Sequence, residues 1–472
     1  MVIKDYKSSP WVKNNGNPWS GKSWGKGKFN PDAFDPSIPY EPKGKTYSFS
    51  LNPDKKIENP FDLDNLRFFN KKKVERLLEL LEDFATDIEK KKDGRQIVSM
   101  IGTGGTIAMT DQNGELVPKL DPEYLLKYAG GTLNERFAIT AIEFPTLIDS
   151  SQMEIDYEAD SVIIMSWIWE NMSENLKKLF SGFLITHGTD TMPEGGAYTA
   201  IMLGPQTPFS VGFVGAQKTT EDNFSDVGIN VKNSLDTLSV LKKEKTSVCF
   251  IYMGGSEGGA YNPTGVIKIS DSNVIAMESP MHPKIVDASN FVLSSLTNSF
   301  QKRVKKENNQ KFHPIIIRGY APTISVNPKL GTNPNHVYET IKKIPNTVAV
   351  IITTFGSFTL NNKITKAAQQ ATKETRKLFC VANPFPEGKV DHKYGPAHIL
   401  RNSGAVSVST MPIAAQAKAT LAQHIYGNDL EKIAAFMAGN NLVGEQPPNW
   451  KQPIKFKDII EPYGLPKDLE LY

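Results

Sequence analysis

The sequence predicts an α/β protein with a larger N-terminal domain built on a parallel sheet, a smaller C-terminal α/β domain and an irregular N-terminal extension. Two observations support this prediction. From Gln96 onward, short apolar runs alternate with helical patterns, and runs that are apolar on both faces are typical of parallel strands covered by helices. After a polar segment at 301–310 the same alternation starts again, which indicates a second domain.

The first 95 residues are expected to form an extension that precedes the two domains. Residues 1–70 are rich in Gly, Pro, Asn, Lys and aromatic residues and show no periodicity, so we expect an irregular arm. The segment KKKVERLLELLEDFATDIEKKK, residues 71–92, places its apolar residues at helical spacing. It predicts one amphipathic helix.

The larger domain is expected over residues 96–300. Its predicted strands are IVSMIGT, AITAIEFP, FLITHG, FSVGFVG and SVCFIYM. Its predicted helices are DPEYLLKYAG, SVIIMSWIWENMSENLKKLF and MPEGGAYTAIML. Because strands and helices alternate along this stretch, the sheet should be parallel and covered by helices.

The smaller domain is expected over residues 311–440, after the polar hinge QKRVKKENNQ. Its predicted strands are PIIIRGY, VAVIITTFG, LFCVANP and AVSVS. Residues 441–472 contain several prolines and predict a C-terminal tail that wraps the surface.

The composition argues against several classes of protein. With 54 basic and 51 acidic residues the chain has no strong field to gather phosphates, so no nucleic-acid partner is expected. Cys249 and Cys380 lie in apolar runs and predict buried free thiols of a reducing compartment. No apolar run is long enough to cross a bilayer, and the N-terminus lacks the hydrophobic stretch of a signal peptide, so we expect a cytoplasmic protein. The seven histidines show no metal-ligand spacing, and we expect neither a metal nor a cofactor.

Ligands of open parallel sheets bind at the carboxyl ends of the strands, so the turn after each predicted strand is a candidate position. The first such turn is GTGGT, residues 102–106. A P-loop would close with Gly-Lys-Ser/Thr, and a dinucleotide fingerprint would need a glycine in place of Ile107, so neither phosphate-binding interpretation fits. Gly104 and Gly105 let the backbone turn sharply and approach a ligand, which leaves Thr106 at the mouth of the site.

The second turn lies in LITHGTDTM, residues 184–192, where a strand ends and a helix follows with Pro193 in its first turn. Thr189 and Asp190 fall at or just before this helix N-terminus, where free N–H groups favour an anion. Helix capping alone would explain either residue. His187 is expected to hydrogen-bond locally.

The two turns together resemble the L-asparaginase family of the bacterial two-domain type. TGGTIA is followed about eighty residues later by ITHGTDTM, and the order of two such specific motifs carries the resemblance. It continues through SSQM at 150–153, VGAQ at 214–217 and GVIKISDSNVIAMESP, in which Lys268 stands at the position of the family's lysine. The resemblance covers about residues 97–430.

The resemblance implies an amidohydrolase that releases ammonia from L-asparagine. Cleaving an amide needs a nucleophile, a route for its proton, and donors aimed at the developing oxyanion. By resemblance, Thr106 attacks the side-chain amide and forms an acyl-enzyme, while Thr189, Asp190 and Lys268 relay protons and activate the hydrolytic water. Backbone N–H groups near Thr189 and Ala216 would line the oxyanion hole. The substrate-binding positions implied are Gly105, Glu115, Ser151, Gln152, Gly188 and Ala216, with Asp190 also holding the amino-acid end of the substrate.

The sequence departs from the family pattern around the lid of the site. Glu115 stands where family members often carry a tyrosine, and we hypothesise that it takes over as the base for Thr106. Lys389 stands where a neighbouring subunit usually lends a glutamate. In FGSFTLN, Ser357 and Thr359 replace the asparagine of the family's second-domain loop. These changes concern substrate preference and turnover rather than the threonine and lysine positions.

Two other functions stay open at this point. One is the related subunit of a tRNA-dependent amidotransferase, but its N-terminal extension should be a small β-barrel, and residues 1–95 show no alternating strands. The other is a non-catalytic binding protein that keeps the fold. Because the family builds each site between two subunits, the resemblance also implies a homodimer or homotetramer.

Overall fold

The computed structural model describes most of the chain from residue 59 to residue 446. The described residues are 59–105, 107, 109–112, 115–118, 127, 129–130, 132–222, 224–295, 302, 312–319, 323–355, 358–382, 395–408, 410–439 and 441–446, with the backbone alone at 109–112, 115–118, 395, 398 and 401. The chain divides into two compact units, residues 1–51 and 52–472. The first unit, which contains most of the predicted arm, lies outside the described residues, as does the tail from 447 onward.

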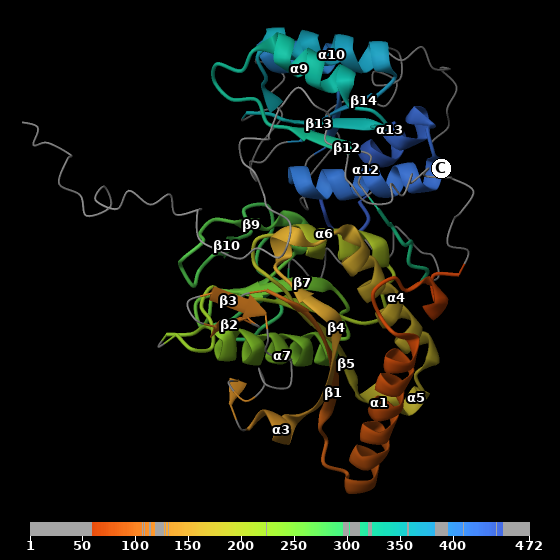
Figure 1. Cartoon of the computed structure of the whole chain (residues 1–472), viewed down its shortest axis with the longest axis vertical. Helices are drawn as coiled ribbons and strands as arrows, with labels where there is room; N and C mark the ends of the chain where they lie inside the picture. The colour runs from red at the N-terminus through yellow and green to blue at the C-terminus, as the bar shows by residue number, and fades with distance from the viewer. Residues whose placement is uncertain are drawn as a thin grey trace, which may run out of the picture. The chain divides into compact units, whose positions relative to one another are not determined.

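The helices of the described chain are distributed over its whole length (Figure 1). They are α1 (Lys71–Lys91), α3 (Leu133–Arg136), α4 (Ile155–Asn171), α5 (Glu174–Leu179), α6 (Met192–Leu203), α7 (Val227–Lys243), α9 (Pro334–Lys343), α10 (Asn362–Thr375), α11 (Gly395–Asn402), α12 (Pro412–Tyr426) and α13 (Leu430–Gly439). Short 3-10 turns are η4 (Leu63–Asn65), η6 (Ser150–Gln152) and η7 (Pro263–Gly265).

The strands form a large sheet, a smaller sheet and two hairpins. They are β1 (Gln96–Gly104), β2 (Met109–Gln112), β3 (Glu115–Pro118), β4 (Phe137–Ile148), β5 (Phe180–Thr186), β6 (Val211–Val214), β7 (Cys249–Met253), β8 (Gly259–Tyr261), β9 (Ile267–Lys268), β10 (Met277–Glu278), β11 (Val286–Asp287), β12 (Thr323–Val326), β13 (Ala349–Thr353), β14 (Leu378–Ala382) and β15 (Val406–Val408). β2 pairs with β3 and β9 pairs with β10 in the two hairpins.

The large sheet has the strand order β11-β8-β7-β6-β5-β1-β4. Strands β4, β1, β5, β6 and β7 are parallel, whereas β8 and β11 join antiparallel. Alternate side chains point to opposite faces: Ile97 and Phe183 join the core with α1, α4 and α6, and Val98 and Leu184 join the core with α7. This two-sided burial explains why the sequence reads as continuous apolar runs.

The smaller sheet, β12-β13-β14-β15, is parallel throughout. Helices α9 and α10 bury Ile341 and Ile364 on one face, and α12 and α13 cover the other. Helix α12 also contacts α6 of the larger domain, so the α6 and α12 layers lie between the two sheets (Figure 1). The predicted fold class, a larger parallel α/β domain followed by a smaller one, is confirmed.

The helix predicted at 71–92 is present as α1. The Asn70 side chain accepts a hydrogen bond from the Lys72 N–H and so caps its start, and the chain leaves the helix through Lys92 in a left-handed conformation. The apolar stripe that includes Leu77 and Leu81 is buried against the large sheet beside β4. Packing of this stripe rather than intrinsic propensity holds the helix in place.

Two predicted elements differ from the structure. The sequence predicts a strand at 314–320, but the described residues there are irregular: Ile316 and Ile317 are buried in the main core and the Ile315 N–H bonds the Met202 carbonyl, so the segment crosses α6 instead of joining a sheet. The single helix predicted at 161–180 is split into α4 and α5. Ser173 accepts the Leu176 N–H through its hydroxyl and starts a new helix.

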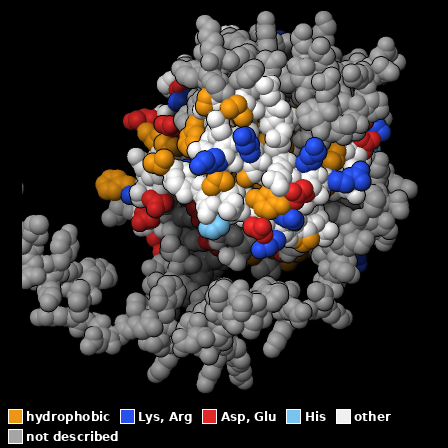
Figure 2. Space-filling model, turned by 90° about the horizontal axis from the view of Figure 1, so that it is seen from above, with side chains coloured by type: hydrophobic (Ala, Val, Ile, Leu, Met, Phe, Trp, Pro, Cys, Tyr) orange, Lys and Arg blue, Asp and Glu red, His pale blue; other side chains and the backbone are white. Residues whose placement is uncertain are grey.

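The state of the cysteines, the character of the helices and the charges on the surface also bear on function. Cys249 and Cys380 are free thiols whose pKa burial raises, to about 12 for Cys380. Within the described chain, no helix combines the length and the apolar character that a membrane crossing requires. Over α9 and α10, the face seen in Figure 2, acidic and basic side chains are interspersed with apolar ones, in keeping with the near-balanced composition.

Candidate active site

The two glycine turns predicted as the site lie against each other. Strands β1 and β5 are neighbours, and the Thr103 hydroxyl donates to the Thr186 carbonyl across 2.7 Å where they end. Gly105 has a φ of +82°, and a Cβ there would lie 2.2 Å from the Gly188 nitrogen. A side chain at 105 has no space, so only glycine allows the two turns to touch.

The Ser-Gln segment is held on the same turn. A Cβ on Gly188 would lie 2.3 Å from the Ser150 Oγ, and the Thr191 hydroxyl donates to the Ser150 carbonyl across 2.8 Å. These contacts bring η6, with Ser151 and Gln152, beside the turn after β5. Both side chains are exposed, so they are available to a ligand.

Lys268 reaches the second turn from the β9–β10 hairpin. Its ammonium donates to the Thr189 Oγ1 at 2.9 Å and to the Asp190 Oδ1 at 2.6 Å. The Lys268 side chain is 19% exposed, whereas the Asp190 side chain is 59% exposed. Lys268 is therefore not a solvated strand lysine, which is what its position in the sequence would suggest on its own.

This arrangement has a definite chemical capacity. A lysine ammonium can only donate, so the Thr189 oxygen accepts from it and keeps its own proton free for another acceptor. Once the amine has given up a proton, it can take the proton of the Thr189 hydroxyl. Asp190 holds the amine at the position where that transfer is possible.

The turn after β6 completes the floor of the site. A Cβ on Gly215 would lie 2.8 Å from the His187 carbonyl and 2.9 Å from Thr189 Cγ2, so Ala216 follows at a close approach of two backbones. Thr189 and Ala216 are buried, and no acceptor for the backbone N–H of either is found among the described residues. Buried N–H groups are nearly always paired in folded proteins, so two such donors at neighbouring strand ends are candidates to bind an oxygen of a ligand.

The remaining predicted residues are described in part or not at all. Thr106 and Lys389 lie outside the described residues, as does Ser357. Glu115 begins β3, but its side chain is not described. Thr359 lies in the second domain, where its carbonyl accepts the Phe355 N–H.

A buried pair that the sequence analysis did not single out lies under the second turn. The His187 ring contacts the Gly188 carbonyl and the Glu158 carboxylate, and both side chains are buried. The signal in the sequence is slight: an acidic residue at 158 inside the largely apolar α4. The local hydrogen bond predicted for His187 is present.

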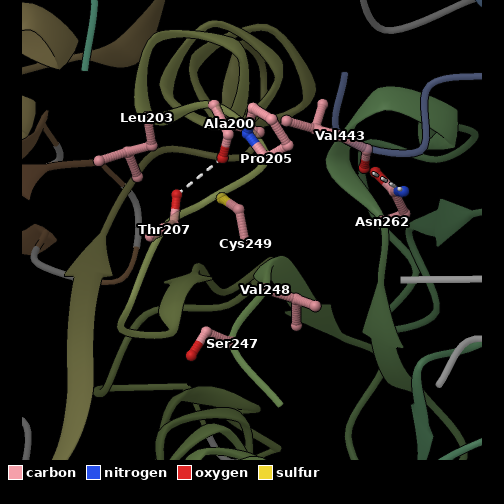
Figure 3. Close-up of a pocket in the computed structure, with 10 residues that line it drawn as sticks. Ala200, Leu203, Pro205, Thr207, Ser247, Val248, Cys249, Asn262 and Val443 are labelled. Carbon is pink, nitrogen blue, oxygen red and sulfur yellow. Dashed lines mark hydrogen bonds between the residues drawn. The ribbon is translucent and has the colours of Figure 1, made fainter. Parts of the chain in front are cut away.

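A separate cavity lies between α6, β7 and the segment at Val443 (Figure 3). Its volume is about 30 Å³, room for about one water molecule. Its lining includes Ala200, Cys249 and Asn262 and none of the predicted site residues, so it is separate from the candidate site. The described part of the chain contains no group of three or more His, Cys, Asp or Glu side chains that could hold a metal ion.

Comparison with known proteins identifies relatives of the part of the chain that carries the candidate site. The sequence model of the asparaginase N-terminal domain matches residues 97–298. These residues form an asparaginase-family domain. It begins within β1 and includes both glycine turns, the Ser-Gln segment and Lys268.

The asparaginase fold extends beyond the matched domain. L-asparaginase from Thermococcus kodakarensis superimposes with a TM-score of 0.59 at 17% identity over 75% of this chain and 100% of that one. L-asparaginase I from Vibrio cholerae gives 0.58 at 21% identity over 75% and 99%. A subunit of the glutamyl-tRNA(Gln) amidotransferase from Archaeoglobus fulgidus is 29% identical over 44% of this chain and 49% of that protein. The chain spans about half the length of the curated relatives it matches.

Proposed function

We propose that the protein hydrolyses the side-chain amide of L-asparagine to L-aspartate and ammonia through a threonine nucleophile. The observation that carries the proposal is the contact of the Lys268 ammonium with Thr189 and Asp190, beside a turn that touches Gly105. Thr106 directly follows Gly105 in the sequence. Amide cleavage through an acyl-enzyme requires a hydroxyl nucleophile and groups that transfer protons. Thr106 would supply the nucleophile, and Thr189 and Lys268 would transfer the protons.

The proposed reaction has two halves. The Thr106 Oγ bonds the side-chain carbonyl carbon, the hydroxyl proton passes to the amide nitrogen, and the C–N bond breaks to release ammonia. Water then attacks the resulting ester with Lys268 and Thr189 taking its proton. The proton returns to the Thr106 Oγ as L-aspartate leaves.

The other residues act on binding and charge. The N–H groups of Thr189 and Ala216 would receive the oxyanion, since both are buried donors to which no described residue offers an acceptor. Ser151, Gln152 and Asp190 would hold the charged amino-acid end of the substrate. Glu115, on the β3 strand, remains our candidate base for Thr106, and unchanged ammonia release from Glu115→Gln would refute that role.

Ammonia release by the purified full-length chain tests the proposal. We expect release from L-asparagine, with L-glutamine measured in parallel, and loss of about a thousandfold or more in Thr106→Ala and Thr189→Val. If the wild-type chain alone releases no ammonia from either amino acid, it is not a free asparaginase, and it is either a component of an amidotransferase or a binding protein with an asparaginase fold. If the Thr106→Ala variant is as active as wild type, another group is the nucleophile.

A second candidate is a component of a tRNA-dependent amidotransferase. The relative from Archaeoglobus fulgidus favours it, because that protein is a subunit of a glutamyl-tRNA(Gln) amidotransferase. The same ammonia assay with and without glutamyl-tRNA and a partner protein separates the two, since a free asparaginase needs neither. A homodimer or homotetramer is our expectation for the free enzyme, and light scattering of the pure chain measures it.

A further inference from the structure

His187 and Glu158 form a buried pair beneath the candidate site. The His187 Nδ1 lies 2.7 Å from the Gly188 carbonyl, and its Nε2 lies 3.2 Å from the Glu158 Oε1. His187 is 1% exposed and Glu158 6%. The pair joins the end of β5 to α4, directly beneath the turn that carries Thr189.

The chemistry of the contacts fixes where one proton sits. A carbonyl oxygen can only accept, so the short contact to Gly188 requires a proton on Nδ1. At Nε2, either the ring donates to a carboxylate or a protonated carboxyl donates to the ring. In both cases Glu158 holds the ring so that Nδ1–H faces Gly188.

This hold determines the direction of the Thr189 N–H. The Gly188 carbonyl and the Thr189 N–H belong to one trans peptide, in which the two bonds point in opposite directions. A ring that fixes the carbonyl on one side therefore fixes the N–H on the other. That N–H is one of the two buried donors without an acceptor among the described residues.

The surroundings leave the pair no room to shift. A Cβ on Gly195 of α6 would lie 2.7 Å from the Glu158 Oε1 and 2.9 Å from the His187 Nε2, so the helix packs on the pair through a glycine. The Phe213 ring lies 5.6 Å from the imidazole on another side. Glu194 of α6 interacts electrostatically with His187, and burial raises the pKa of its carboxyl.

We propose that His187, oriented by Glu158, is a positioning residue that aims the Thr189 N–H at the oxyanion formed during amide hydrolysis. The proposal rests on the proposed function and adds to it a group that does not touch substrate. Gly195 contributes to this positioning, because the lack of a Cβ lets α6 pack directly on His187 and Glu158.

Paired substitutions test this role through kcat and KM for L-asparagine. Asparagine can place an N–H near the position of Nδ1, whereas leucine has a similar shape and no donor. We expect His187→Leu to lower kcat about 10- to 100-fold with KM within about threefold, since losing one oxyanion donor entirely costs about 100- to 1,000-fold. His187→Asn should stay within about fivefold of wild type.

The partner of the histidine is tested in the same way. Glu158→Gln can still donate to Nε2 and should retain most of the activity, while Glu158→Leu should lose kcat as His187→Leu does. Equal kcat for leucine and amide variants at either position, or losses confined to KM, would overturn the proposal. Melting temperatures compared within each pair separate this effect from a loss of folded protein.

A measurement independent of turnover separates this inference from the proposed function. In protein labelled with ¹⁵N at histidine, the ring shifts of His187 should report a proton on Nδ1 in the wild type and in Glu158→Gln. An unprotonated Nδ1 would overturn the inference even in an active enzyme. A wild-type chain with Nδ1 protonated but without ammonia release would refute the proposed function and leave the hydrogen bond established.

Discussion

At the scale of single residues, glycine at 105 is what brings the two motifs together. Its backbone is left-handed, and its missing Cβ leaves the space that the Gly188 backbone occupies. The chain offers a matched control in Gly94, which is also left-handed at +70° but has nothing within 4 Å of a Cβ. Alanine substitutions at the two positions separate the cost of the left-handed backbone from the cost of a clash with the Gly188 backbone.

We expect Gly94→Ala to lower the free energy of unfolding by about 1–2 kcal/mol, the cost of a left-handed non-glycine residue. Gly105→Ala should cost more, because the Gly188 backbone must also move, and it should abolish ammonia release. Urea unfolding and the ammonia assay measure the two effects. Equal losses of stability at both positions would show that the turns are not in contact.

The amine of Lys268 is the second residue-scale feature that can be tested. Lys268→Met keeps most of the length of the side chain and removes the donor to Thr189 and Asp190. We expect a fall in kcat of about 100- to 10,000-fold, the range for a lost acid–base group, with little change in melting temperature. Lys232→Met, which removes a partly buried contact with Asp236 on α7, should leave ammonia release unchanged. Full activity of Lys268→Met would exclude a role for the amine in proton transfer.

At the scale of elements, the sequence predicted the strands of the sheets better than their connections. Strands such as β1 and β5 are buried on both faces, and that condition leaves a clear apolar run in the sequence. The segment 314–320 has the same apolar character, but it fills space beside α6, and burial without strand pairing leaves the same pattern. The break between α4 and α5 depends on one serine cap. The sequence does not reveal it, because apolar residues follow helical spacing on both sides of the serine.

The candidate site also contains residues that the sequence predicts and residues that it does not. Thr189, Asp190 and Lys268 could be predicted because each lies in a specific motif, and the structure brings the three together. Glu158 lies in no motif, and its contact with His187 joins residues that are 29 positions apart. A contact of this kind arises from how α4 packs on the sheet, which a single sequence does not reveal.

A buried charge cluster joins three elements near α4. Arg318, in the segment before the second sheet, donates to Asp156 and Asp160 of α4 at 3.0 and 2.6 Å, and also to the Asn65 carbonyl. Arg67 and the Phe68 N–H bind the same two aspartates from the extension side. The cluster therefore ties residues 65–68 to the connection between the two domains.

Removing Arg318 should be costly because its aspartates are almost fully buried. We expect Arg318→Met to lower the free energy of unfolding by about 3 kcal/mol, since breaking a buried ion pair leaves an uncompensated charge. Arg76→Met, which removes the exposed contact with Glu79, should be indistinguishable from wild type. Urea unfolding monitored by fluorescence measures both, and equal effects would show that the cluster does not hold the elements together.

At the scale of the whole molecule, the segment 441–446 links the second domain to the first. Glu445 forms a fully buried ion pair with Lys418 of α12 at 2.9 Å and accepts the Leu442 and Val443 N–H groups. Asn262 of the first domain donates to the Gly444 carbonyl. Lys418 and Glu445 are buried away from water. Protonation of a side chain next to them should therefore change the free energy of unfolding of the whole protein.

His282 is the neighbour that titrates in an accessible range. It is 7% exposed, and burial lowers its pKa to about 4, against which the charge of Glu445 acts only in part. In the unfolded chain the imidazole takes up a proton near pH 6.5, while in the folded protein it stays neutral down to about pH 4. The unfolded state therefore binds more protons between these values, and stability falls as the pH falls through this window.

We expect this histidine to remove about 2 kcal/mol of unfolding free energy between pH 7 and pH 5, a loss that its replacement should abolish. The quantity to measure is the difference in unfolding free energy between wild type and His282→Gln at each pH, because the direct cost of the substitution is the same at both. The difference should shrink by about 2 kcal/mol on going to pH 5, since the wild type alone loses this contribution. A difference that stays constant would mean that the folded protein accepts the proton as readily as the unfolded chain does.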